Sequence, residues 1–107
     1  MQAQGHAQVL VDILDLGANL QAAADIARFR HNQTRNVLSL ESSLFHLVGP
    51  ELSAMGHTVR AIDGADVGGV QMILFTPSPQ EPPGAPALRG FYRSGSDFRK
   101  DGEAVGW

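Results

Sequence analysis

The feature that most constrains this chain is an apolar stretch close to its N-terminus. Residues 6–16 have the spacing of a helix, in which only Asp12 and Asp15 interrupt the apolar character. Its apolar residues are Val9, Leu10, Val11, Ile13, Leu14 and Leu16. A helix that is apolar nearly all round needs burial on more than one side. Because no strand precedes it, we expect one of its faces to lack a partner within this chain.

Composition limits the classes of protein to which the chain can belong. Its 107 residues predict one domain, and its net charge of −3 argues against a nucleic-acid partner. The absence of cysteine excludes disulfides, thiol catalysis and cysteine-based zinc sites. The sequence contains no apolar run long enough to span a membrane, and residues 1–6 lack the basic region and long apolar stretch expected of a signal peptide. These features do not distinguish the periplasm from the cytoplasm.

The pattern along the rest of the chain predicts an α+β fold, with helices packed on a mostly antiparallel sheet. Residues 1–107 are read as a single unit. The predicted helices are one over 6–16, a second that is capped by Asn19 and closed by the cations of 28–31, and a third over 44–55 that kinks or restarts at Pro50. The predicted strands cover 37–41, 57–62, 68–75 and 88–92. A proline-rich excursion over 76–88 precedes the last strand, and a turn-rich tail follows it.

The residues that could carry chemistry form no familiar constellation. The four histidines are His6, His31, His46 and His57. No two of them have the four-residue spacing of a helical zinc pair, so no metal or cofactor site is expected. Asp12 and Asp15 have the spacing of an acid–base pair, but it is more typical of the polar stripe of a helix. The glycines of 64–69 lack the lysine of a phosphate-binding loop.

Two other features have both a structural and a functional interpretation. The prolines of 76–88 suit either an inserted loop or a polyproline ligand for a partner domain. Arg28 and Arg30 flank Phe29, and Arg99 lies in the tail. Pairing with carboxylates is a commoner role for such arginines than catalysis. From its residues alone, the chain is therefore an α+β unit without a self-contained active site.

Six segments, in order and over nearly the whole chain, resemble motifs of the gamma-glutamyltransferase (gamma-glutamyltranspeptidase) family. The C-terminal segment 92–107 resembles the family's ending, which has an aromatic, Gly/Ser residues, Ser-Asp-Pro-Arg, an Asp-Gly and a final Gly before an aromatic. The other five segments are 2–8, 15–21, 25–29, 55–59 and 68–73. Two departures stand out: Phe98 replaces the family's proline, and Ile26-Ala27 replaces Ala-Pro.

The resemblance implies a part of an N-terminal-nucleophile (Ntn) hydrolase, whose fold is a four-layer αββα sandwich. Members of this family are proenzymes that cleave themselves, and the new N-terminal threonine then attacks a gamma-glutamyl amide such as glutathione. Thr34, Thr58 and Thr76 lie in no such motif, so no catalytic or substrate-binding residue is expected in this chain. The resemblance implies that the partner is the N-terminal part of the proenzyme, namely the large subunit and the start of the small subunit.

The resemblance also assigns four residues a structural role in subunit packing, and these are Arg28, Phe29, Asp97 and Arg99. The abrupt start at Met1 predicts a truncated gene, a misplaced start codon or a cut chain. The leading hypothesis is therefore a C-terminal fragment that is inactive alone and prone to self-association through exposed apolar faces. The alternatives are a sibling amidohydrolase or acylase of the same fold, and a non-enzymatic interaction module.

Overall fold

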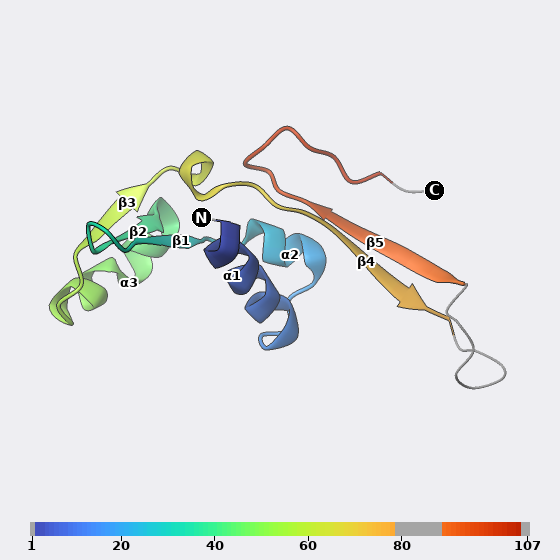
Figure 1. The fold of residues 1–107 in the computed structure, drawn as a ribbon, viewed down its shortest axis with the longest axis horizontal. Coiled ribbons are helices and arrows are strands. Elements are labelled where there is room, and N and C mark those ends of the chain that lie inside the picture. The colour runs from blue at the N-terminus through green and yellow to red at the C-terminus, as the bar shows by residue number, and fades with distance from the viewer. Residues whose placement is uncertain (1, 79–88, 106–107) are drawn as a thin grey trace.

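The computed structural model of the protein describes residues 2–78 and 89–105 and has two separate sheets with three α-helices (Figure 1). Its elements are α1 (Gln2–Leu14), α2 (Leu20–Asp25), β1 (Phe29–Asn32), β2 (Val37–Glu41), α3 (Ser42–Ala54), β3 (Val59–Ile62), the 3₁₀ helix η1 (Gly64–Val67), β4 (Gln71–Pro77) and β5 (Gly90–Ser96). This mixture confirms the predicted α+β class.

The first sheet has the order β1-β2-β3, with β1 antiparallel and β3 parallel to β2. The parallel pairing requires a crossover, which α3 provides. Side chains alternate between the two faces of a strand, so Leu38 and Leu40 share one face of β2 while Ser39 and Glu41 share the other. Leu40 is only 2% exposed. The sheet therefore has an apolar face beside α3 and a polar face on its opposite side.

The second sheet is the hairpin of β4 and β5, which reaches away from the other elements (Figure 1). Its two strands pair over seven residues each, from Gln71 opposite Ser96 to Pro77 opposite Gly90. The hairpin gives the molecule a radius of gyration of 17.5 Å, whereas a compact domain of this length has about 13 Å. Ile73 and Tyr92 on this hairpin are more than 70% exposed.

The second helix is shorter than the sequence predicts. α2 ends at Asp25, and residues 29–32 form the strand β1 rather than the last helical turn. The prediction was wrong because pairing with β2, which is invisible to local patterns, overrides the propensity of this segment. The predicted N-cap is confirmed, since the Asn19 side chain accepts a hydrogen bond from the Ala22 amide at 2.8 Å.

Three further predictions are corrected by the structure. Of the two alternatives predicted at Pro50, a restart of the helix is wrong, because α3 continues through this residue. β5 includes Ser94 to Ser96, which the sequence assigns to a turn-rich tail, because their backbone pairs with β4. The strands form two sheets rather than one, although two of the three strand pairings are antiparallel, as predicted. Residues 79–88 of the proline-rich excursion lie outside the described residues, whereas Thr76 and Pro77 belong to β4.

α1 is attached to the edge of β1 by two glutamine side chains. The Gln4 amide accepts a hydrogen bond from the His31 amide at 2.8 Å and donates one to the His31 carbonyl at 2.9 Å. Gln8 makes the same pair with Phe29, at 3.0 and 2.8 Å. Because an unpaired strand edge invites association with another strand, the two amides take the place of a neighbouring strand.

The apolar character of α1 is only partly used within this chain. Val9 is its one buried residue, whereas Leu10 and Leu14 are 54% and 75% exposed. This exposure agrees with the expectation that one face of the helix lacks a partner. In the part of the chain that the structure describes, no helix is long and apolar enough to cross a membrane.

Replacing both Gln4 and Gln8 by alanine should destabilise the protein by about 1–3 kcal/mol, because four partly exposed hydrogen bonds to β1 are lost. Urea unfolding followed by circular dichroism measures the change. Gln33→Ala, in the exposed turn between β1 and β2, is the matched control. Equal unfolding midpoints for the double variant and the control would show that α1 is held by other contacts.

Candidate functional site

Four charged side chains that are distant in the sequence meet in the interior. The Arg28 guanidinium bonds to Asp97 Oδ2 at 2.6 Å, and Arg99 bonds to Asp97 Oδ1 at 2.9 Å. Arg99 also forms a two-point contact with Glu41, at 2.6 and 2.8 Å. All four side chains are at least nine-tenths buried. We call Arg28, Glu41, Asp97 and Arg99 the charge network.

Glu41 occupies the point where β2 ends and α3 begins. Its carboxylate accepts a hydrogen bond from the Arg28 backbone amide as well as the two from Arg99. Its own amide donates to the Arg28 carbonyl at 3.0 Å. Close approach here depends on Gly64, because a Cβ at that position would lie 2.8 Å from Glu41 Oε1. Glu41 therefore joins the end of β2 to the start of β1 and to the C-terminal turn.

Both arginines also cap the C-terminal end of α2. The last carbonyls of a helix lack partners within the helix and carry partial negative charge. The Ala24 carbonyl accepts from Arg28 at 3.0 Å and from Arg99 at 2.8 Å, and the Ile26 carbonyl accepts from Arg99 at 3.1 Å. Of the cations of 28–31 that the sequence predicted at this helix end, Arg28 contacts it, whereas the second cation is the distant Arg99.

Asp97 lies in the turn that follows β5 and is fully buried. Its carboxylate accepts hydrogen bonds from the amides of Arg99 and Val70, each at 3.0 Å. Its own amide donates to the Val70 carbonyl at 3.1 Å, which continues the pairing of β4 and β5 by one residue. Backbone groups therefore hold Asp97 in place in addition to the two guanidinium groups.

Asp97 and Arg99 keep their charges at neutral pH. Burial alone would raise the pKa of Asp97, but hydrogen bonds from Arg99, Arg28 and Val70 hold this pKa below its ordinary value. Burial alone would lower the pKa of Arg99, but Glu41 and Asp97 raise it above its ordinary value. Groups shifted in these directions do not exchange protons near pH 7. The arrangement therefore suits a structural lock better than acid–base chemistry.

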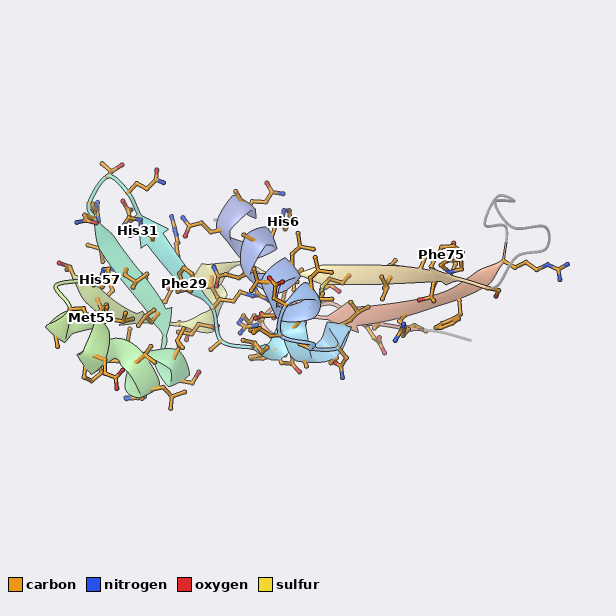
Figure 2. The ribbon with its side chains drawn as sticks, turned by 90° about the horizontal axis from the view of Figure 1, so that it is seen from below. His6, Phe29, His31, Met55, His57 and Phe75 are labelled. Carbon is orange, nitrogen blue, oxygen red and sulfur yellow. The ribbon has the colours of Figure 1, made fainter. Side chains whose placement is uncertain are left out.

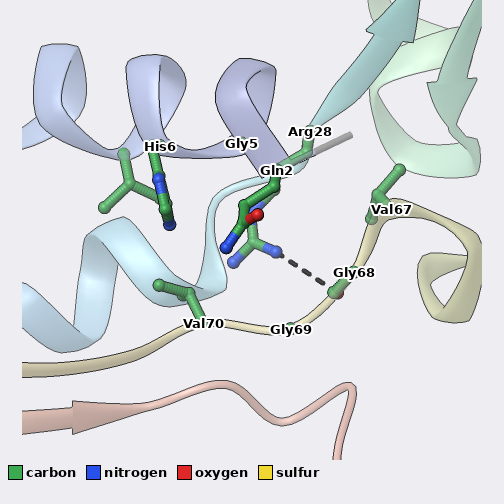
Figure 3. A pocket seen from close by; sticks show the side chains of 9 residues that line it. Gln2, Gly5, His6, Arg28, Val67, Gly68, Gly69 and Val70 are labelled. Carbon is green, nitrogen blue, oxygen red and sulfur yellow. Dashed lines mark hydrogen bonds between the residues drawn. The ribbon is translucent and has the colours of Figure 1, made fainter.

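A small pocket of about 230 Å³ adjoins the network, between the start of α1 and the loop 67–70. Figure 3 shows Gln2 of α1 next to the Arg28 guanidinium and His6 of the same helix to its left. The guanidinium donates to the Gly68 carbonyl at 3.4 Å. The Nε atom of Arg28 is buried and has no hydrogen-bond partner among the described residues. Gly68 has a φ of +80°, a conformation that favours glycine at this turn.

The structure brings three of the four predicted site residues together. Arg28, Asp97 and Arg99 belong to the charge network, and both arginines pair with carboxylates as the sequence predicts. Phe29 does not join them, because it is 40% exposed and lies over an apolar groove beside α1 and α3. The Arg99 guanidinium instead lies over the ring of Phe98, 4.6 Å from its centroid.

Glu41 is the network member that sequence reasoning missed. The alternation of 37–41 predicts a strand with leucines inward, but it does not indicate that the polar face is also buried at its end. Glu41 and Arg99 are 58 residues apart, so no local pattern joins them. The one available signal was that Glu41 is the only charged residue in the strand predicted over 37–41, and lies at its end.

The other candidate groups stay apart. Among residues 2–78 and 89–105, no three His, Asp or Glu side chains are grouped to hold a metal ion. Figure 2 shows His6 on α1, away from His31 on β1 and His57 before β3. Asp12 is half-buried at the apolar groove, where burial raises its pKa despite the opposing effect of Arg28. Asp15 is exposed.

Comparison with known proteins decides the family. The family model of gamma-glutamyltranspeptidase matches residues 1–107, which is the whole chain. The chain belongs to the gamma-glutamyltranspeptidase family. The resemblance that its motifs indicate is therefore confirmed. No functionally curated protein gives a significant sequence match.

Solved structures agree with this family and with the Ntn-hydrolase fold. A cephalosporin acylase from Bacillus halodurans superposes with a TM-score of 0.77 and 25% identity over 96% of this chain. A Helicobacter pylori gamma-glutamyltranspeptidase variant, T380A, gives 0.71 and 20% over 92%. The same values are found for an acivicin-inhibited gamma-glutamyltranspeptidase, whose C-terminus has critical roles in autoprocessing and catalysis. This chain spans 17% of the acylase chain and 48% of each transpeptidase chain.

Asp97→Asn should lower stability at pH 7 by about 3–5 kcal/mol, the usual cost of breaking a buried ion pair. Because the folded-state pKa of Asp97 is depressed, its contribution is complete above the unfolded-state pKa of about 3.9 and is lost as pH falls through the folded-state value. The variant should therefore show a flatter decline in stability below about pH 4 than the wild type.

Urea midpoints measured between pH 7 and pH 2 test this prediction. Asp101→Asn, an exposed neighbour in the same turn region, is the control and should follow the wild-type profile. If Asp97→Asn and Asp101→Asn have the same profile, the network does not stabilise the fold.

Proposed function

We propose that this chain acts as the C-terminal part of the nucleophile-bearing small subunit of a gamma-glutamyltranspeptidase-like hydrolase. The observation that carries the proposal is the family match over all 107 residues of a chain that spans only about half of each transpeptidase chain. The parent would cleave or transfer a gamma-glutamyl amide through an acyl-threonine intermediate. A sibling acylase shares this fold, and no observation favours it over the transpeptidase assignment.

The distribution of apolar surface supports a role as part of a larger assembly. An apolar groove of about 610 Å³ lies between α1, β1, β2 and α3 and is open to solvent. The aromatic pair of Phe75 and Tyr92 on the hairpin is exposed as well, with ring centroids 4.9 Å apart. Exposed apolar surface of this kind commonly marks a contact with another protein segment. We assign both surfaces to contacts with the upstream part of the parent protein.

We assign the charge network a role in maturation rather than in the chemical step. It ties the turn that follows β5 to the ends of α2 and β2 through Asp97 and Arg99. In the acivicin-inhibited relative the C-terminus matters for autoprocessing, and the same requirement is proposed for this family member. A C-terminal segment that is not locked in place would leave the sheet incomplete during self-cleavage.

The purified 107-residue chain should release no 4-nitroaniline from gamma-glutamyl-4-nitroanilide above the buffer rate. Its threonines are Thr34, Thr58 and Thr76, and none provides the free amine that activates this class of nucleophile. Thr76 is engaged by Arg93 at 3.2 Å within the hairpin. Release that scales with protein concentration and disappears in a threonine-to-alanine variant would refute the proposal.

In the full-length parent, Arg28→Ala and Arg99→Ala should each slow self-cleavage at least tenfold, because each leaves a buried carboxylate without its partner. Arg99→Lys should restore only part of the rate, since an ammonium lacks the two-point fork that contacts Glu41. Electrophoresis and mass spectrometry of the new N-terminus measure cleavage. Arg93→Ala, on the hairpin, is the control, and equal cleavage in all variants would contradict the maturation role.

A further inference from the structure

The polar face of the three-stranded sheet carries a row of basic residues away from the charge network. Arg30 on β1 lies opposite Ser39 on β2, and Ser39 lies beside Arg60 on β3. Strands are about 4.8 Å apart, so the two arginine backbones flank Ser39 at about 10 Å from each other. Because paired residues project to the same face, both guanidinium groups rise from the same side of the sheet.

A third arginine and a hydroxyl complete this surface. Arg35 and Thr34 come from the turn between β1 and β2, and with Arg30, Ser39 and Arg60 they line a cleft of about 380 Å³. That volume is at the lower end of the range of about 300–1,000 Å³ found for small-molecule pockets. Asp66 of η1 is the one acidic residue in the lining. We call this the arginine cleft.

Within the part of the chain that the structure describes, ion pairs do not neutralise the positive charge of the arginine cleft. The described residues form three ion pairs, and none of them involves Arg30, Arg35 or Arg60. Three guanidinium groups against one carboxylate leave an excess of two positive charges in the cleft. The chain as a whole has a net charge of −3 and only eight cationic side chains, so placing three in one cleft is a marked concentration.

One of these arginines is already positioned. The Nε atom of Arg60 donates to the Ser39 hydroxyl at 2.9 Å, and Ser39 is only 4% exposed. A guanidinium that is held through Nε still offers its terminal amino groups as a planar donor pair. Such a pair matches the oxygen spacing of phosphate and carboxylate groups.

We propose that the arginine cleft binds a small dianion, either a phosphate monoester or a dicarboxylate. The charge excess matches two negative charges, and the guanidinium forks match oxyanions. Arg30 and Arg60 contact the anion from opposite sides, and Arg35 closes the cleft from the turn. The site is distinct from the charge network, and the inference does not depend on the proposed hydrolase function, because binding to this chain requires no activity.

Calorimetric titration of the 107-residue chain with glycerol 2-phosphate, and separately with succinate, tests the inference at constant ionic strength. We expect saturable one-to-one binding of one of these probes, and the probe that binds more tightly identifies the ligand class. Because the second ionisation of a phosphate monoester has a pKa of about 6, phosphate binding should be weaker at pH 5 than at pH 7.5. Failure of both probes to saturate would overturn the proposal.

Arg30→Gln and Arg60→Gln should each raise the dissociation constant at least tenfold. Ser39→Ala should raise it several-fold while keeping every charge, because Arg60 loses its fixed orientation. Arg93→Gln removes an arginine from the hairpin, outside the cleft, and should leave binding unchanged. Circular dichroism confirms that each variant is folded. An equal loss for Arg93→Gln would show that net charge alone attracts the anion, and the inference would be wrong.

Discussion

The fold depends on keeping four charges buried and mutually neutralised. Arg28, Glu41, Asp97 and Arg99 come from three places in the chain, and each contacts another at 2.9 Å or less. Removing charged groups from water costs several kcal/mol per ion, and only close, multiply bonded partners offset this cost. The loss of one member therefore leaves the buried charge of another without its partner. It holds the ends of α2 and β2 and the turn after β5 at a single point.

The charge network lies beside a small hydrophobic core. The buried apolar residues are Val9, Leu20, Ala23, Ala24, Leu40, Ile62 and Val67, and two of these are alanines. Larger apolar side chains, such as Leu14 on α1 and Ile73 on the hairpin, are three-quarters exposed. The charges specify where the segments meet, while much of the apolar surface that would stabilise them remains uncovered. Such a balance fits a segment that completes its core against the remainder of a larger Ntn hydrolase.

Elements that depend on local sequence patterns could be predicted, whereas those that depend on long-range contacts could not. The alternation of 37–41, the cap at Asn19 and the apolar spacing of 6–16 are local, and each predicted element exists. β1 was missed because its strand character comes from β2 and from the glutamines of α1, which are 21 to 27 residues away. Asp97, Arg28 and Arg99 were found through family motifs, whereas Glu41 lies outside every matched motif and was not.

The polar face of the three-stranded sheet carries both the buried charge network and the open arginine cleft. Arg28 and Glu41 occupy its covered end, where Asp97 and Arg99 satisfy them. Two residues away along β2, on the same face, Arg30 and Arg60 flank Ser39 at the open end, and no ion pair among the described residues involves either arginine. The covered end carries motif residues of the family, but Arg30 and Arg60 each lie one residue beyond a matched motif. The proposed anion would therefore contact residues that are separate from the buried charges that hold the sheet in place.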